Sequence, residues 1–236
     1  MAKKVGMNLQ ENKELERCYK KYIEQQTEGY EIIAKIIGYT VEKMAQEGLI
    51  DSDVQISGRL KSFKSAFEND KRKGIVDCFG IRIVAKDEKD KITIMQEIEK
   101  ILTVHKTRIH GTDGKEKYKG IHHLVSINEQ YITDNERVSK INYPLVEVQY
   151  WTKELEKMCV GGELAYSKYK KKDIRRILEL YRKDPEAVYN KLPVCYEIKG
   201  NSARVLERQE ALFKIYPEIE AGEKKKETKQ QEPELC

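Results

Sequence analysis

Two acidic residues in predicted buried strands are the side chains best suited to chemistry in this sequence. Asp77 lies in the run G-I-V-D-C-F-G-I-R-I-V, residues 74–84, which is the strongest strand signal in the chain. Glu147 lies in a second apolar run, L-V-E-V-Q, 70 residues later. A carboxylate in a buried strand is costly unless it is paired, hydrogen-bonded or bound to metal. The pattern therefore favours a shared cation, and carboxylate ligands suit Mg²⁺ together with substrate phosphates.

A basic block that begins at Gly58 is a candidate phosphate site. The run G-R-L-K-S-F-K-S contains Arg59, Lys61 and Ser65, and we expect a short strand over residues 53–57 before it and a helix after it. Backbone N–H groups at a helix start, joined by Arg and Lys side chains, readily bind anions. The alternative is an ordinary basic helix whose charges face water.

The strand predicted for residues 145–150 has one polar side. Alternation places Glu147, Gln149 and Trp151 on that side and apolar residues on the other. Such a side faces either water or a binding site. Tyr118, which follows a polar loop expected over residues 106–117, offers a flat ring for a base.

Length, charge and cysteine content limit the classes of protein to which this chain can belong. The 236 residues are enough for one core with a helical appendage, and the net charge of +5 is compatible with a phosphate-rich ligand or RNA without requiring either. No apolar run reaches the roughly 20 residues that span a bilayer, and the N-terminus lacks the apolar core of a signal peptide. The five cysteines form no CxxC pair. We therefore expect a cytoplasmic protein with no membrane partner.

Apolar spacing predicts helices around these strands. They are expected over residues 8–48, 91–103 and 202–215, with another that starts at residue 153 behind an N-cap at Thr152. The basic stretch 166–176 either holds an RNA backbone or forms a solvated helix face. Strands that alternate with helices, and carry carboxylates, fit a site for nucleotide transfer.

Four blocks, in order, resemble the motifs of the RelA/SpoT-type alarmone synthetases. The first two are residues 58–65, similar to the family's G-R-x-K-x-x-x-S, and residues 77–82, D-C-F-G-I-R, similar to D-x-x-[GA]-x-R. The others are residues 118–122, Y-K-G-I-H, similar to Y-x-S-L-H, and residues 147–149, E-V-Q, similar to E-x-Q. Each block alone is weakly specific, but the ordered set is strong and covers roughly residues 50 to 170.

The resemblance implies an α/β (α+β) fold: a nucleotidyltransferase-like mixed β-sheet flanked by helices. It also implies a Mg²⁺-dependent GTP diphosphokinase, which moves the β,γ-diphosphate of ATP onto the 3′-hydroxyl of GDP or GTP to give (p)ppGpp and AMP. It assigns Asp77 and Glu147 to the metal and to catalysis, Arg59, Lys61 and Ser65 to ATP, and Tyr118, His122, Gln149, Lys115 and Lys117 to the acceptor.

The resemblance also suggests how the chain is organised. A synthetase core is expected over residues 51–185, with an N-terminal helical segment packed on it over residues 1–50. A C-terminal helical extension is expected over residues 186–221 and a disordered tail over residues 222–236. No segment resembles the hydrolase or regulatory domains of the long family members, so we expect a small single-domain synthetase. Small members are often oligomers, which makes a homo-oligomer a further expectation.

The chain departs from the family pattern mainly on the acceptor side. Gly120 stands where the family has Ser, Trp151 where it has Arg, and Asn69 where it has Lys. Two alternatives to a guanine-nucleotide acceptor therefore stay open. One is a toxin-type diphosphotransferase that modifies the 3′ end of tRNA, and the other is a catalytically inactive, nucleotide-binding regulator.

Overall fold

The structure is a computed structural model that describes residues 9–61, 63, 66, 78–111, 118–128, 141–160, 174–190, 192–217, 219–221 and 223. Four residues predicted for the site, Ser65, Asp77, Lys115 and Lys117, lie outside these residues, as do most of the basic stretch 166–176 and the tail from residue 224. Within the described part of the chain, no helix is both long enough and apolar enough to cross a membrane.

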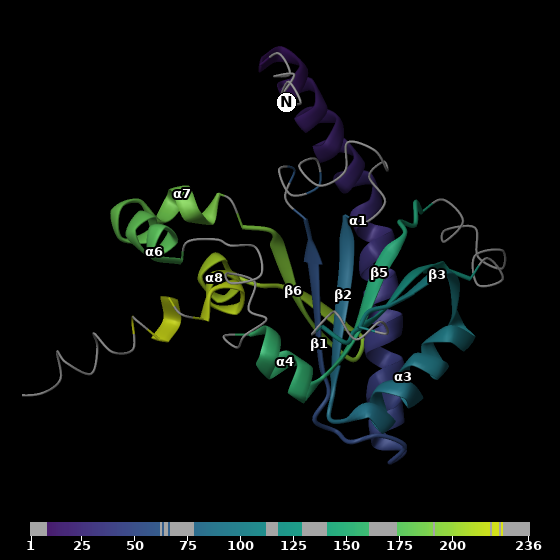
Figure 1. Ribbon diagram of the computed structural model, residues 1–236. Coiled ribbons are helices and arrows are strands. Elements are labelled where there is room, and N and C mark those ends of the chain that lie inside the picture. Colours follow the sequence, from purple (N-terminus) through teal and green to yellow (C-terminus); the bar gives the residue numbers. More distant parts are fainter. Residues whose placement is uncertain are drawn as a thin grey trace, which may run out of the picture.

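Seven strands form one mixed sheet at the centre of the fold (Figure 1). Their order is β3-β4-β5-β2-β1-β6-β7, with the respective bounds Leu102–Ile109, Ile121–Ile127, Val146–Thr152, Phe79–Ala85, Gln55–Leu60, Val194–Lys199 and Ser202–Val205. β2 and β5 are parallel, and the other neighbouring pairs are antiparallel. The helices around the sheet are α1 (Leu9–Gln46), α3 (Glu88–Ile101), α4 (Lys153–Cys159), α6 (Ile174–Lys183), α7 (Pro185–Tyr189) and α8 (Arg208–Ile215). This mixed sheet flanked by helices confirms the predicted fold class.

One face of the sheet is apolar and carries the main core. Phe79, Ile81 and Ile83 of β2 alternate along the strand and are at most 1% exposed. Side chains of α1 and α3 complete this core, and Figure 1 shows α1 running behind the sheet with its N-terminal end extending past the strands. Burying a side chain of this size contributes about 1.5–3 kcal/mol, so this layer stabilises the sheet.

The helix α1 is continuous through two glycines. Gly29 and Gly38 are weak helix formers, but other backbone segments lie against both of them. A Cβ at Gly29 would be 2.2 Å from the carbonyl oxygen of Asn142, and one at Gly38 would be 2.4 Å from that of Gly200. The two glycines therefore allow the helix to pack closely on the segment before β5 and on the β6–β7 turn.

The opposite face of the sheet is polar and only partly covered. α4 packs on this face through Leu155, which joins Val84 and Trp151 in a small apolar cluster. α6, α7 and α8 share a separate cluster around Val188 and Leu212, and Figure 1 shows these helices beside β6.

Three expectations about the elements are wrong. The loop predicted over residues 106–117 begins later, because β3 continues to Ile109. The helix predicted over residues 202–215 begins only at Arg208, because Ser202–Val205 pairs with β6 as β7. β1 continues through Leu60, so Arg59 lies in a strand and not at a helix start. β3 and β7 are mostly exposed edge strands, so they lack the apolar alternation by which a strand is recognised in sequence.

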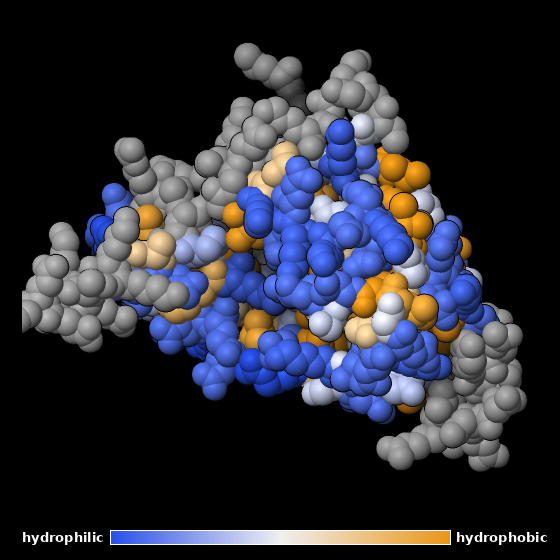
Figure 2. Space-filling model, turned by 90° about the horizontal axis from the view of Figure 1, so that it is seen from below, coloured by the Kyte–Doolittle hydropathy of each residue, from blue (hydrophilic) through white to orange (hydrophobic). Residues whose placement is uncertain are grey.

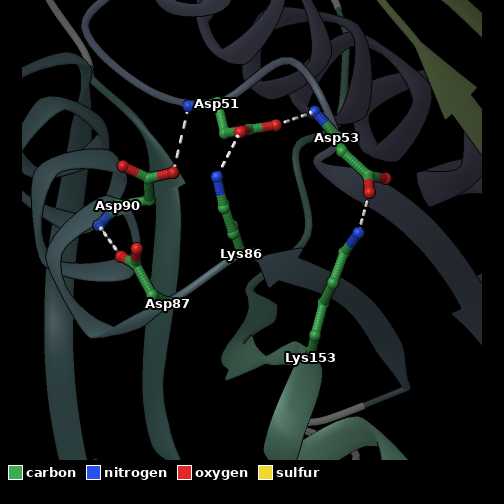
Figure 3. A network of polar contacts seen from close by, with 6 residues as sticks. All are labelled: Asp51, Asp53, Lys86, Asp87, Asp90 and Lys153. Atoms are coloured by element: carbon green, nitrogen blue, oxygen red, sulfur yellow. Dashed lines mark hydrogen bonds and ion pairs between the residues drawn. The ribbon is translucent and has the colours of Figure 1, made fainter.

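The end of the molecule seen from below is mostly hydrophilic, with apolar atoms in separate groups (Figure 2). A set of polar contacts at this end, the lower-edge network, consists of Asp51, Asp53, Lys86, Asp87, Asp90 and Lys153 (Figure 3). Lys86 pairs with Asp51 at 2.8 Å, and Lys153 pairs with Asp53. Asp87 caps α3 by accepting from the N–H of Asp90 at 3.0 Å, and Asp90 accepts from the N–H of Asp51 at 3.0 Å. The network joins the segment before β1 to the starts of α3 and α4.

Candidate active site

The pairing of four strands gathers the candidate residues on the polar face of the sheet. The register produces two neighbouring rows, with Arg59, Gly80 and Glu147 in the first and Arg82, Gln149 and His122 in the second. Side chains in one row of a sheet lie about 5 Å apart, which is close enough for direct contact between long polar groups.

Six side chains on this face form a closed circuit of contacts, here called the contact ring: Arg82, Tyr118, His122, Glu147, Gln149 and Trp151. In its first arm, the Nε1–H of Trp151 donates to the Tyr118 hydroxyl at 2.7 Å. That hydroxyl lies 2.6 Å from Nε2 of His122. Nδ1 of His122 in turn lies 3.3 Å from Oε1 of Glu147.

The second arm reaches the other oxygen of Glu147. Nε2 of Gln149 donates to Oε2 of Glu147 at 2.8 Å. Nε and Nη2 of Arg82 both donate to Oε1 of Gln149, at 3.3 and 3.2 Å. The guanidinium carbon of Arg82 lies 3.7 Å from the centroid of the Trp151 ring, a cation–π contact that closes the circuit. Each carboxylate oxygen of Glu147 thus has one partner from a different arm.

The contact ring keeps Glu147 ionised. Burial by itself would raise the pKa of this carboxyl, since only 14% of the side chain is exposed. The hydrogen bond and charge of His122, the hydrogen bond of Gln149 and the charge of Lys61 outweigh burial and lower the pKa to about 2. At neutral pH the site therefore contains a half-buried carboxylate. Each of its two oxygens keeps at least one lone pair for a further ligand.

Two cations lie at the end of β1, and the charge of one of them, Lys61, acts on this carboxylate. Lys61 directly follows the strand, and its backbone N–H donates to the carbonyl of Cys78 at 2.9 Å. Arg59 extends across Gly80 toward β5, since a Cβ at Gly80 would be 3.7 Å from Cγ and 3.8 Å from Nε of Arg59. Within the described residues, no hydrogen bond or ion pair neutralises the Arg59 guanidinium. Its charge acts on Arg82 instead, where burial and then Arg59 lower the pKa to about 10.

Tyrosines from α1 hold the strands that carry these cations. The Tyr30 hydroxyl donates to the carbonyl of Gly80 at 3.1 Å, and the Tyr19 hydroxyl donates to the carbonyl of Lys61. Gly58 leaves room for the Tyr30 hydroxyl, because a Cβ at position 58 would lie 2.1 Å from the tyrosine oxygen. Side chains of the apolar layer thus fix the backbone on which Arg59 and Lys61 stand.

The structure brings six of the predicted site residues together: Arg59, Lys61, Tyr118, His122, Glu147 and Gln149. Two members of the contact ring, Arg82 and Trp151, are not among the residues that the sequence assigns to the site. Strand alternation does place Trp151 on the side of Glu147 and Gln149, so a signal for it exists in the sequence. Arg82 is the last residue of the D-C-F-G-I-R block, and the parallel pairing of β2 with β5 places it beside Gln149. His110 also joins this group, with its ring centroid 4.7 Å from that of His122.

With the geometry established, comparison with known proteins identifies the fold. No protein-family model matches the sequence, and no curated protein matches it. Among solved structures, the small alarmone synthetase 1 from Bacillus subtilis bound to its product pppGpp has a TM-score of 0.51 and 22% identity, over 74% of this chain and 93% of that one. The chain has the small alarmone synthetase fold. A GTP pyrophosphokinase family protein from Streptococcus pneumoniae gives a TM-score of 0.50 and 17% identity, over 78% of this chain and 92% of that one.

The small alarmone synthetase fold confirms, at the level of architecture, the resemblance drawn from the four sequence blocks. The described residues also allow a test of whether the site suits Mg²⁺. They contain no group of three or more His, Cys, Asp and Glu side chains placed to hold a metal. An ionised Glu147 nevertheless fits an ion that takes one or two protein carboxylates and draws its other ligands from phosphates and water.

Proposed function

We propose that the chain is a diphosphotransferase that moves the β,γ-diphosphate of ATP onto the 3′-hydroxyl of GDP or GTP. The observation that carries this proposal is an ionised, half-buried Glu147 on which the charge of Lys61 acts, in the same strand row as Arg59, whose charge no described side chain neutralises. A site of this kind offers cations for phosphates and a carboxylate for a metal or a hydroxyl. The small alarmone synthetase fold supports the same reading, since one protein with this fold is bound to pppGpp.

Arg59 and Lys61 bind the ATP phosphates in this proposal, with Ser65 beside them. Charge-assisted hydrogen bonds from guanidinium and ammonium groups to phosphate are about twice as strong as neutral ones. Phosphoryl-type transfer depends chiefly on positioning and on neutralising the charge of these oxygens, so cations already held in place by β1 and α1 are well suited to it.

Glu147 and Asp77 are the residues that would hold Mg²⁺, which neutralises phosphate charge when it is bound. Glu147 also accepts a hydrogen bond from the acceptor hydroxyl and so directs its oxygen at the β-phosphorus of ATP. A bond forms from that oxygen to phosphorus as the bond to the bridging oxygen of the α-phosphate breaks, and AMP leaves with the electron pair. Because a carboxylate with a pKa of about 2 is a weak base, Glu147 takes the proton late and passes it to solvent.

The acceptor lies on the β4 side in this proposal. Tyr118 provides a ring for the base, His122 and Gln149 orient the sugar and hydroxyl, and Lys115 and Lys117 approach the phosphates. His122 and Gln149 already contact Glu147. The residues that orient the acceptor are therefore in direct contact with the carboxylate that receives the proton of the acceptor hydroxyl.

Product analysis tests the proposal directly. Purified protein is incubated with ATP labelled at the β-phosphate and with Mg²⁺, and GDP, GTP and deacylated tRNA are offered in parallel. Transfer of label to GDP or GTP, with AMP released in equal amount, is the expected result. Label on tRNA alone would select the tRNA-modifying alternative. ATP binding without transfer to any acceptor would favour the regulator and overturn the proposal.

A further inference from the structure

Trp151 is the point at which both arms of the contact ring begin. It is the only tryptophan in the chain and is 5% exposed, near the end of β5. Its apolar neighbours Val84 and Leu155 hold the ring from β2 and α4. Its indole N–H starts the first arm and its ring face starts the second.

The donor and acceptor properties of each group give the first arm a direction. An indole N–H only donates, so the Tyr118 oxygen accepts from Trp151. The Tyr118 hydroxyl donates to Nε2 of His122 when the imidazole is neutral and accepts from it when the imidazole is charged. In both states the hydrogen on Nδ1 faces Oε1 of Glu147, since a neutral ring that accepts at Nε2 carries its hydrogen on Nδ1 and a charged ring carries hydrogens on both nitrogens.

The second arm is directed in the same way. The Trp151 ring face holds the Arg82 guanidinium, which donates twice to Oε1 of Gln149. Because that oxygen receives both hydrogen bonds, the amide nitrogen of Gln149 must point the other way, toward Oε2 of Glu147. One aromatic side chain therefore fixes a hydrogen-bond donor at each oxygen of the carboxylate.

We propose that Trp151 is a positioning residue, which orients both oxygens of Glu147 through the two arms of the contact ring without touching a substrate. Gly120 is part of the same arrangement, because a Cβ at this position would lie 2.4 Å from the Tyr118 hydroxyl oxygen and would displace it. Gly120 thus leaves room for the Tyr118 hydroxyl, and Trp151 donates a hydrogen bond to it. Both residues place the hydroxyl that contacts His122 and, through His122, Glu147. The catalytic part of this inference rests on the proposed function, but the geometric part does not.

Three substitutions break the first arm at three different residues. Trp151→Phe removes the indole N–H and keeps a ring face for Arg82, Tyr118→Phe removes the hydroxyl and keeps the ring, and Gly120→Ala displaces the hydroxyl. Each should lower kcat about 10- to 100-fold, as expected for a misplaced catalytic group, and leave KM for ATP within about twofold. Trp151→Leu, which removes both arms, should cost more than Trp151→Phe.

Tyr150→Phe is the matched control. Tyr150 precedes Trp151 on β5 and points to the opposite face, and its buried hydroxyl has no hydrogen-bond partner among the described residues. Its removal should leave kcat, KM and the melting temperature unchanged. Equal losses of kcat in this variant and in Tyr118→Phe would show that the first arm has no special role, which would overturn the proposal.

The geometry can be tested without any enzymatic activity. A single tryptophan gives a single indole N–H cross-peak in a ¹⁵N-correlated NMR spectrum, and a hydrogen bond of 2.7 Å moves it downfield. Tyr118→Phe and Gly120→Ala should both shift this peak upfield, while Tyr150→Phe should not. If the wild-type protein transfers no diphosphate, the proposed function fails but these shifts still support the contact ring. If the peak does not respond to Tyr118→Phe, or if folded variants keep the wild-type kcat, the positioning role is refuted.

Discussion

The contact ring and the lower-edge network are built from similar kinds of side chain, but they serve opposite purposes. Each carboxylate of the lower-edge network accepts from a lysine or from a backbone N–H at a helix start or turn. In the contact ring, Glu147 receives its hydrogen bonds from an imidazole and an amide, while Arg59 nearby has no anionic partner among the described residues. The first arrangement satisfies charges within the protein, and the second leaves a cation and a carboxylate available to a ligand.

The ion pair of Lys86 and the contact between His122 and Glu147 differ in exposure. Lys86 of the lower-edge network is well exposed, and ion pairs in such places contribute about 0–1 kcal/mol. His122 and Glu147 are only 12% and 14% exposed, so water screens their interaction less. The lower-edge network pairs its charges within the protein, whereas the contact ring leaves a partly buried carboxylate beside cations, and this difference favours the contact ring as the candidate site.

The largest expected effect is on activity. Glu147→Gln removes the charge that would meet the metal and the acceptor hydroxyl, and should reduce diphosphate transfer about 1,000-fold. Asp51→Asn in the lower-edge network is the control and should keep kcat within about twofold. Steady-state assays with ATP and the guanine nucleotide measure both. Similar losses in the two variants would remove the distinction between the regions.

The second-largest expected effect is on the pH dependence of stability. The pKa of Glu147 is lowered from its ordinary 4.5 to about 2, so its contribution is present above pH 4.5 and is lost as the pH falls toward 2. The shift corresponds to roughly 3 kcal/mol. Urea unfolding in metal-free buffer should show the wild-type advantage over Glu147→Gln shrinking by about that amount from pH 6 to pH 2. An advantage that is constant with pH would contradict the assignment.

Arg59→Ala should weaken ATP binding more than it changes the stability of the fold. Loss of charge-assisted hydrogen bonds worth about 1.5–3 kcal/mol corresponds to a fall in kcat/KM for ATP of about 10- to 100-fold. The free energy of unfolding should stay equal or rise, because the Arg59 charge acts unfavourably on Arg82. Isothermal titration with a non-hydrolysable ATP analogue and thermal melting measure the two effects. A large loss of stability with unchanged ATP affinity would make Arg59 a structural residue.

The smallest effect is expected from the lower-edge network itself. Asp87→Ala removes the N-cap of α3 and should cost about 1 kcal/mol of unfolding free energy, with kcat unchanged. Lys153→Ala should cost less than this, because it removes one partly exposed ion pair. Chemical denaturation at neutral pH ranks the two. A fall in kcat without a fall in stability would link this end of the molecule to the site.

Much of the fold follows from local patterns in the sequence. The apolar spacing of α1, the alternation in β5 and the capping residue Thr152 of α4 all appear in the structure at the predicted places. The edge strands β3 and β7 were not predictable in this way, since an exposed strand is stabilised by pairing with a neighbour and not by burying alternate residues. The continuity of α1 through Gly29 and Gly38 likewise depends on segments distant in sequence.

The sequence by itself identified candidates for the chemistry: the carboxylates Asp77 and Glu147, Arg59 and Lys61 in one basic block, and Tyr118 and His122 in another. Residue type and strand parity are local properties, so they can be read without a structure. Only the tertiary structure decided that Arg82 and Trp151 complete a circuit around Glu147, because that circuit is assembled from β2, β4 and β5 by non-local pairing. Hydrogen-bond direction and register across strands, and not residue type, set the orientation of the carboxylate.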